Sequence, residues 1–181
     1  MMVVMDGDII RNMDAPEFDD WAICMTYWVA SKSKDPRTHV GAIVFGPGRE
    51  IRTTGYNSLP RGVDDSKTYR FEKGEKEVWV PHAEQNAIYN STRTGVSLLG
   101  CTMYVCYFPC MPCAVALSQS GITEVVSDAN WDNGDLNEEE IYERRRRVFE
   151  LFGENGVVHR FHKTKYAPLE RFNDGVRTRL A

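Results

Sequence analysis

Apolar residues near the start of the chain recur with the period of a helix. Within residues 16–31 they stand at positions i, i+3, i+4, i+7 and i+8. This spacing is typical of an amphipathic helix that has one face for a core. We therefore expect a helix here whose buried stripe is Trp21, Cys24, Met25, Trp28 and Val29.

The next segment favours strands. Residues 38–58 read THVGAIVFGPGREIRTTGYNS, which is two β-rich runs around the turn residues GPGRE, and they predict a hairpin. Residues 59–79 are polar, contain Pro and Gly, and show little periodicity, so we interpret them as a long ordered loop. Loops of this length inside a compact domain are usually functional.

Helices and strands then alternate. We expect helices over residues 82–95 and 109–121 and strands over 101–108 and 122–128, followed by a helix over 136–156, a short apolar run at 157–161 and a polar tail over 163–181. The order strand, helix, strand predicts an α/β sandwich rather than a helical bundle.

Four consecutive arginines, 144–147, lie within the last of these helices. Successive helical residues point about 100° apart, so the four side chains cannot form one patch. Glu140 precedes Arg144 by four residues, and Glu143 precedes Arg147 in the same way, which favours ion pairs along the helix. We interpret the run as a solvated helix face rather than a nucleic-acid site.

Composition narrows the class of protein. With 181 residues and 42% hydrophobic content, the chain can bury one sizeable core, so we expect a single domain over residues 1–181. A net charge of −4 and a pI near 5.6 exclude a protein whose main work is neutralising nucleic-acid phosphates. No run approaches the roughly 20 apolar residues that span a bilayer, and the first residues do not resemble a signal peptide, so we expect a cytoplasmic protein.

Three side chains form a candidate metal site. The chain has 5 cysteines, and Cys110 and Cys113 form a Pro-Cys-x-x-Cys motif at the start of a predicted helix. His82 opens another predicted helix one strand earlier. Imidazole and thiolate ligands suit zinc, and a helix N-terminus favours the thiolate form. Three protein ligands leave a fourth position open for water, as in a catalytic zinc site.

Glu84 stands two residues after the histidine, in the first turn of its helix. There it can lie beside the water without binding the metal. Zinc lowers the pKa of a bound water to about 7, and a neighbouring carboxylate can pass its proton to a leaving amine. This is the chemistry of hydrolytic deamination.

Each motif alone has a simpler interpretation. Pro-Cys-x-x-Cys by itself indicates a redox pair or half of a structural zinc site, and His-x-Glu by itself is usually surface decoration. Together, in this order, they match the H-x-E…P-C-x-x-C signature of zinc nucleobase deaminases.

Four segments extend this match. SKDPRTHVGAIV, GYNSLPRGVDD, HAEQNAIYN and FPCMPCA…SGI resemble, in order, motifs of the deoxycytidylate (dCMP) deaminase family over about residues 16–160. The resemblance implies the cytidine deaminase-like fold, a three-layer α/β/α sandwich with a mixed five-stranded sheet. It also implies one catalytic zinc per chain on His82, Cys110 and Cys113, with Glu84 as proton shuttle.

The resemblance further implies a substrate site. It assigns substrate contacts to Asn57, Ala83, Arg93 and Trp131. Asn57 matches an asparagine near the sugar and base, Arg93 an arginine tied to recognition of the nucleotide, and Trp131 a position where an aromatic ring stacks near the base. Local chemistry leaves other roles open: a turn asparagine for Asn57, carbonyl capping at a helix end for Arg93, and core packing for Trp131.

The sequence departs from the family at two points. The common GYNG reads GYNS here, and because that glycine loop is associated with a triphosphate effector, regulation stays open. Some members carry a second, structural zinc in the long loop, but residues 58–80 contain no Cys or His, so we expect one zinc. The resemblance also implies a homo-oligomer, commonly a hexamer.

The expected function is deamination of dCMP to dUMP and ammonia, which supplies thymidine nucleotide synthesis. No motif counts phosphates, so dCTP is an alternative substrate. A tRNA adenosine deaminase shares both metal motifs but requires a basic surface that a chain of charge −4 lacks. A zinc-stabilised binding module without turnover is the third hypothesis, and the open ligand position and Glu84 argue against it.

Overall fold

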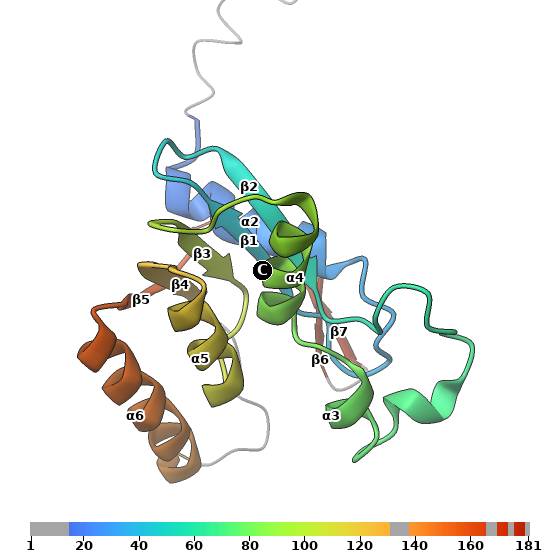
Figure 1. Ribbon diagram of the computed structural model, residues 1–181. Helices are drawn as coiled ribbons and strands as arrows, with labels where there is room; N and C mark the ends of the chain where they lie inside the picture. Colours follow the sequence, from blue (N-terminus) through green and yellow to red (C-terminus); the bar gives the residue numbers. More distant parts are fainter. Residues whose placement is uncertain (1–14, 131–137, 166–169, 174–175, 180–181) are drawn as a thin grey trace, which may run out of the picture.

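The computed structural model describes residues 15–130, 138–165, 170–173 and 176–179. Its centre is a five-stranded sheet in the order β2-β1-β3-β4-β5 (Figure 1). β1 pairs antiparallel with β2 and β3, whereas β3, β4 and β5 are parallel, so the sheet is mixed as predicted. The strands are β1 (Gly41–Phe45), β2 (Ile51–Tyr56), β3 (Thr102–Val105), β4 (Glu124–Asp128) and β5 (Val158–His162).

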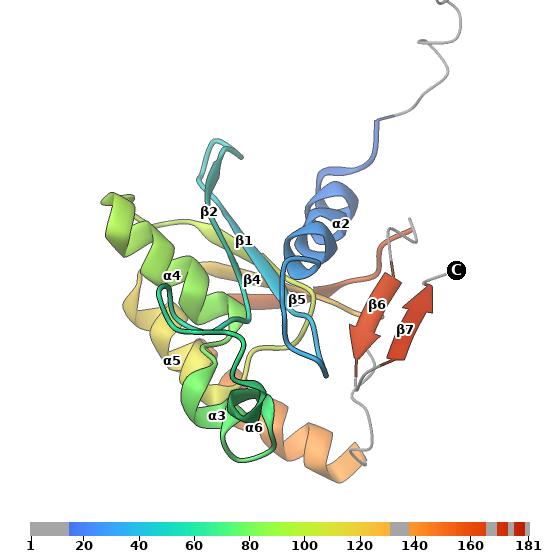
Figure 2. The same cartoon turned by 90° about the vertical axis from the view of Figure 1, so that its right-hand side faces the viewer.

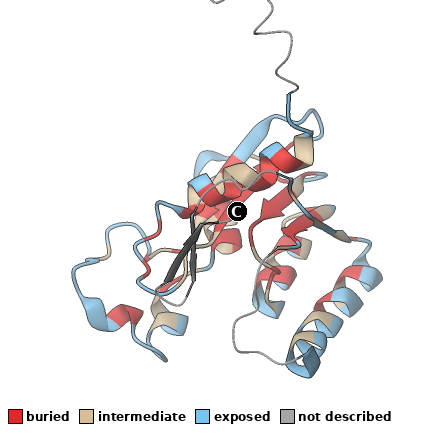
Figure 3. Ribbon diagram, turned by 180° about the vertical axis from the view of Figure 1, so that it is seen from behind, coloured by how far each residue is buried: buried red, intermediate tan, exposed pale blue. Residues whose placement is uncertain are grey.

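Helices cover both faces of the sheet, which confirms the three-layer sandwich. α2 (Phe18–Ala30) lies on one face, and α4 (Ala83–Thr94), α5 (Met111–Gln119) and α6 (Glu138–Asn155) lie on the other (Figure 2). Alternate strand residues face alternate layers. Ile43 and Tyr104 pack with α2, whereas Val44 and Met103 belong to the cluster under α4, α5 and α6. Figure 3 shows the buried residues gathered in the sheet and on the helix faces turned toward it.

The apolar stripe predicted for α2 is only partly correct: Met25 and Val29 pack against the core, but the two tryptophans do not face it. Trp28 is 64% exposed and Trp21 is 39% exposed, so the prediction that they face the core is wrong. A Cβ placed on Gly41 of β1 would lie 2.0 Å from the backbone oxygen of Thr26 and 2.6 Å from the nitrogen of Ala30. The two backbones are so close that an indole ring does not fit between them. The buried residues of α2 are Asp20, Ala22, Ile23, Thr26, Tyr27 and Ala30.

The segment predicted as a long loop has its own structure. It contains a 3₁₀ turn, η1 (Thr68–Phe71), and a one-turn helix, α3 (Lys76–Trp79). Leu59, Phe71 and Val80 form a small hydrophobic cluster, and the guanidinium of Arg70 lies 4.5 Å from the ring centroid of Trp79. These contacts order a loop whose sequence offers no Cys or His for a structural metal.

The last residues also differ from the interpretation as a polar tail. They contain an antiparallel hairpin of β6 (Glu170–Asn173) and β7 (Val176–Arg179). Asp-Gly, a common hairpin dipeptide, stands between these strands in the sequence. None of the described helices has the length and apolar content that crossing a bilayer requires.

Candidate metal centre and active site

The position of His82 is set by how α4 meets the sheet. A Cβ on Gly55 of β2 would lie 2.2 Å from the oxygen of Ala83 and 2.3 Å from the nitrogen of Ala87, so the absence of a side chain lets α4 lie directly on β2. His82 is the N-cap of α4, and its backbone N–H donates to the side chain of Gln85 at 3.1 Å. The contact with β2 and the hydrogen bond to Gln85 together fix the start of α4.

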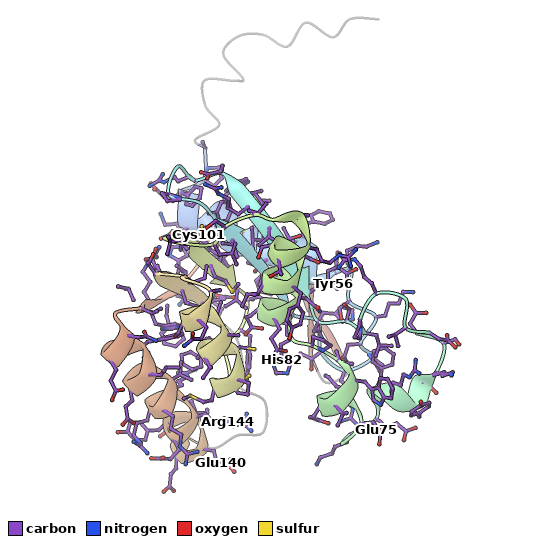
Figure 4. The ribbon with its side chains drawn as sticks, viewed as in Figure 1. Tyr56, Glu75, His82, Cys101, Glu140 and Arg144 are labelled. Atoms are coloured by element: carbon purple, nitrogen blue, oxygen red, sulfur yellow. The ribbon has the colours of Figure 1, made fainter. Side chains whose placement is uncertain are left out.

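The two cysteines enter from the start of α5. Cys110 is the N-cap of α5, and Cys113 lies in its first turn and is fully buried. Each sulfur lies 3.4 Å from Nδ1 of His82. Tetrahedral zinc, with bonds of about 2.3 Å to sulfur and 2.0–2.1 Å to nitrogen, holds such ligands about 3.5 Å apart. The spacing of the three donors therefore fits this metal. Figure 4 shows His82 at the end of α4 that faces α5.

The pKa values of the two thiols are shifted in opposite directions. A hydrogen bond from the Cys113 thiol lowers the pKa of Cys110, and the same contact raises the pKa of Cys113. The hydrogen bond with Cys110 also raises the pKa of His82. A soft cation would replace these protons, because thiolate is the ligand form. Within the described residues, His82, Cys110 and Cys113 form the cluster of His, Cys or acidic side chains that could hold a metal.

Glu84 lies beside this cluster without belonging to it. Its side chain is in the first turn of α4, and the residue is 3% exposed. Burial raises the pKa of its carboxyl, and the nearby His82 works in the opposite direction. A carboxyl with a raised pKa can accept and return a proton near neutral pH. Ala83, between ligand and acid, is fully buried.

Asn57 is buried at the exit of β2 and is bonded through its side chain. Its amide nitrogen donates to Asp35 at 3.1 Å and to the oxygen of Thr38 at 2.8 Å, and its Oδ1 accepts the N–H of Val40 at 2.8 Å. Both amide hydrogens are therefore used, while one lone pair of Oδ1 remains. A ligand can contact this side chain only by donating to it.

Asp35 is a residue that the sequence reasoning missed. It is 1% exposed, and its carboxylate accepts the N–H of Arg37 at 2.9 Å and of Thr38 at 3.2 Å. The same carboxylate binds the Asn57 amide and the ammonium of Lys76 at 2.6 Å. The sequence signal was Asp-Pro in SKDPRT, because Asp commonly bonds the backbone two or three residues ahead in a turn.

One predicted substrate residue, Arg93, does not lie at the metal centre. Arg93 lies exposed in the last turn of α4, at the end opposite His82. Trp131 lies outside the described residues, so its stacking role stays a prediction. The structure gathers His82, Ala83, Glu84, Cys110 and Cys113 at the adjoining ends of two helices.

Comparison with known proteins gives a family and a fold. Residues 16–129 match the family described as the cytidine and deoxycytidylate deaminase zinc-binding region. The deoxycytidylate deaminase of Mus musculus is 32% identical over 176 residues, covering 93% of each chain. That of Homo sapiens is 37% identical over 121 residues, covering 64% of this chain and 67% of its own.

Two solved structures share the architecture. The dCMP deaminase of cyanophage S-TIM5 in its apo form superposes with a TM-score of 0.61 at 21% identity, covering 82% of this chain and all of that one (100%). Its complex with dCMP and dUMP gives a TM-score of 0.58 at 22% identity, over 87% and 99% of the two chains. At this identity the likeness supports the same fold.

Proposed function

The chain belongs to the cytidine and deoxycytidylate deaminase family, and from that membership we propose that it hydrolyses the 4-amino group of dCMP to give dUMP and ammonia. It is a deaminase. The observation that carries the proposal is the meeting of His82 Nδ1 with two thiols beside the buried carboxyl of Glu84. The names of the mammalian relatives support dCMP as the substrate.

The resident metal in this proposal is one zinc per chain. His82, Cys110 and Cys113 would hold it, and their spacing supports this set. When bound, zinc supplies a Lewis acid that makes water a nucleophile near neutral pH. His82 is exposed whereas Cys113 is buried, so the centre opens toward solvent on the side where a substrate enters.

Glu84 is the proton shuttle. In the reaction, water oxygen bonds to C4 of the pyrimidine and the C4–N4 bond breaks. Glu84 takes a proton from the water and delivers it to the leaving nitrogen, which departs as ammonia, so the carboxylate is regenerated. The burial that raises the pKa of Glu84 suits both transfers.

The substrate contacts are proposed from the geometry of the same region. Asn57 accepts a hydrogen bond from a sugar hydroxyl, because an acceptor lone pair is what its bonded side chain offers. Ala83 lines the base position between His82 and Glu84. Arg93 would contact substrate only in a neighbouring subunit, so its role depends on the proposed homo-oligomer, and Trp131 is proposed to stack on the base.

Two further proposals concern the whole chain. We treat the core of about residues 16–160 as one deaminase domain, which is supported by a single sheet shared between both large hydrophobic clusters. The five described cysteines are free thiols, which supports a reducing compartment such as the cytoplasm.

A substrate panel tests this function. Zinc-loaded protein is incubated with dCMP, dCTP, CMP and deoxycytidine, and ammonia release is measured. We expect the highest kcat/KM for dCMP. A higher kcat/KM for dCTP would assign the triphosphate, rather than dCMP, as the substrate. Absence of turnover on the whole panel would overturn the proposal, and deamination of a tRNA adenosine instead would assign the alternative substrate.

A further inference from the structure

The face of α4 that covers β2 carries two asparagines one turn apart. β2 is an edge strand of the five-stranded sheet, so one side of its backbone has no strand partner in the described part of the chain. The amide nitrogen of Asn86 donates to the carbonyl oxygen of Tyr56 at 2.8 Å, and that of Asn90 donates to the carbonyl oxygen of Thr54 at 2.7 Å. Helix residues four apart share a face, and these two side chains therefore cover part of the open edge of β2.

Asn86 differs from Asn90 in what else its amide nitrogen reaches. This nitrogen lies 3.3 Å from Oγ of Ser58 and 3.4 Å from the carbonyl oxygen of Pro81. Its two hydrogens are thus shared among three acceptors, of which Tyr56 is the nearest. Asn86 thereby joins the end of β2 to the turn that precedes α4.

The three acceptors adjoin two parts of the proposed active site. Asn57, the proposed contact for a sugar hydroxyl, stands between Tyr56 and Ser58 in the sequence, and the third acceptor directly precedes His82. The backbone N–H of Asn86 also donates to the carbonyl oxygen of His82 at 2.9 Å, as the first turn of α4 requires. Figure 4 shows Tyr56 alongside α4 and His82 at its start. One side chain therefore connects a candidate metal ligand with the residues around Asn57.

The side-chain bonds of Asn57 itself run to a different part of the fold. Its amide nitrogen binds Asp35 and Thr38, and its oxygen accepts the N–H of Val40, all in the segment that leads into β1. These bonds fix Asn57 relative to β1, whereas the metal centre is built at the starts of α4 and α5. Asn86 supplies hydrogen bonds from α4 to the backbone beside Asn57, so it relates the two parts.

We propose that Asn86 is a positioning residue that sets the distance between the metal centre and Asn57, and thereby the fit of the substrate sugar. The inference rests on the proposed function, because it takes Asn57 to accept a hydrogen bond from a hydroxyl of the deoxyribose. In dCMP the 5′ oxygen carries the phosphate, so the 3′ hydroxyl is the only sugar hydroxyl that can donate. A displacement of Asn57 by about 1 Å is enough to weaken such a contact, while the zinc ligands and Glu84 stay in place.

The test uses a nucleotide that lacks the donating group. 2′,3′-Dideoxycytidine 5′-monophosphate (ddCMP) keeps the base and the phosphate of dCMP but has no sugar hydroxyl. On zinc-loaded protein, kcat/KM is measured for both nucleotides. We expect the wild type to prefer dCMP by about ten- to a hundredfold, the scale of leaving one buried acceptor without its partner. Asn86→Ala should lose about tenfold on dCMP and change less than threefold on ddCMP, so that most of the preference disappears.

Thr53→Val is the matched control. The hydroxyl of Thr53 also joins β2 to α4, because it donates to the carbonyl oxygen of Ala87 at 3.0 Å, but it lies four residues before Asn57. Valine keeps the shape of threonine and removes this hydrogen bond. The control should keep the wild-type preference for dCMP, and zinc content should be unchanged in both variants.

Two further variants separate the amide hydrogens of Asn86 from its size. Asn86→Gln keeps the donors and should retain more of the preference for dCMP than Asn86→Asp, which keeps the size without the donors. This pair decides the question if Asn86→Ala does not fold.

The outcomes that contradict the inference are distinct. Equal losses on dCMP and ddCMP in Asn86→Ala, an unchanged preference, or the same loss of preference in Thr53→Val would overturn it. A wild type that deaminates both nucleotides equally well would also overturn it, because Asn57 would then make no hydroxyl contact for Asn86 to support. A wild type that turns over no cytosine nucleotide would contradict the proposed function instead.

Discussion

The carboxylate of Asp35 accepts a hydrogen bond from the side-chain amide of Asn57 at 3.1 Å, and both residues are buried. The same carboxylate is ion-paired with Lys76 of α3 at 2.6 Å. This contact favours one orientation of the Asn57 amide, because its nitrogen must face the acid. The carbonyl of Thr38 and the N–H of Val40 favour the same orientation, so the oxygen of Asn57 faces Val40.

Asp35→Asn should disturb this orientation while keeping the size of the side chain. The new amide loses the ion pair with Lys76 and can donate toward Asn57, so it opposes the orientation that Thr38 and Val40 favour. We predict that KM for dCMP rises about tenfold while kcat and zinc content change little. Asp65→Asn, which removes the exposed pair with Lys34, is the control and should leave KM unchanged. An unaltered KM in Asp35→Asn would show that Asp35 does not act through Asn57.

Metal content should follow the three proposed ligands. Elemental analysis of wild-type protein is expected to give one zinc per chain. Cys110→Ala should lose the metal, because two remaining protein ligands hold zinc weakly. Cys24→Ala is the matched control, since Cys24 is a free thiol of α2 outside the cluster. Full zinc content in Cys110→Ala, or active protein without metal, would contradict this ligand set.

The exposure of Trp28 on α2 gives a stability prediction. Ile23 is fully buried, so Ile23→Ala should lower the free energy of unfolding by about 2–5 kcal/mol. Trp28 is 64% exposed, so Trp28→Ala should change it by less than about 0.5 kcal/mol. Urea denaturation of both variants measures the difference. The opposite ranking would restore the face predicted from the sequence.

His159 makes folding depend on pH. Burial, with the Arg145 charge nearby, lowers the pKa of His159 from an ordinary 6.5 to about 4. Its Nδ1 has no hydrogen-bond partner among the described residues. Because the unfolded chain binds a proton below pH 6.5 and the folded chain does so only below about 4, stability from this residue is lost as pH falls through that window.

Between pH 6.5 and 4, the free energy of unfolding is expected to fall by about 2–4 kcal/mol because of His159. His159→Phe keeps an aromatic ring among Phe108, Phe149 and Phe161 and has no proton to gain. Denaturant midpoints across this range should therefore fall less in the variant than in the wild type. If the denaturant midpoints of variant and wild type fall equally with pH, His159 is not the source of the pH dependence.

Much of the architecture could be predicted from local patterns. The elements of the sheet and the helices that open at His82 and Cys110 follow from periodicity and turn residues, because these signals act over a few neighbouring positions. The Pro-Cys-x-x-Cys and His-x-Glu motifs predicted the metal cluster for the same reason: helix starts place their side chains in known directions.

The sequence-based predictions that were wrong or incomplete concern contacts between segments that are distant in the sequence. A period of 3.6 shows which residues of α2 share a face, but the close approach at Gly41 decides which face is buried. Asp35 reaches Asn57 and Lys76 across 22 and 41 residues of sequence, so no local pattern shows the pairing.

The most direct test of the mechanism is the turnover of zinc-loaded Glu84→Gln. This change keeps the size of the side chain and removes its capacity to carry a proton, while His82, Cys110 and Cys113 are untouched. The account predicts one zinc per chain, as in the wild type, and a kcat on dCMP lower by about two to four orders of magnitude. Turnover within a few-fold of the wild type, at full zinc content, would contradict it.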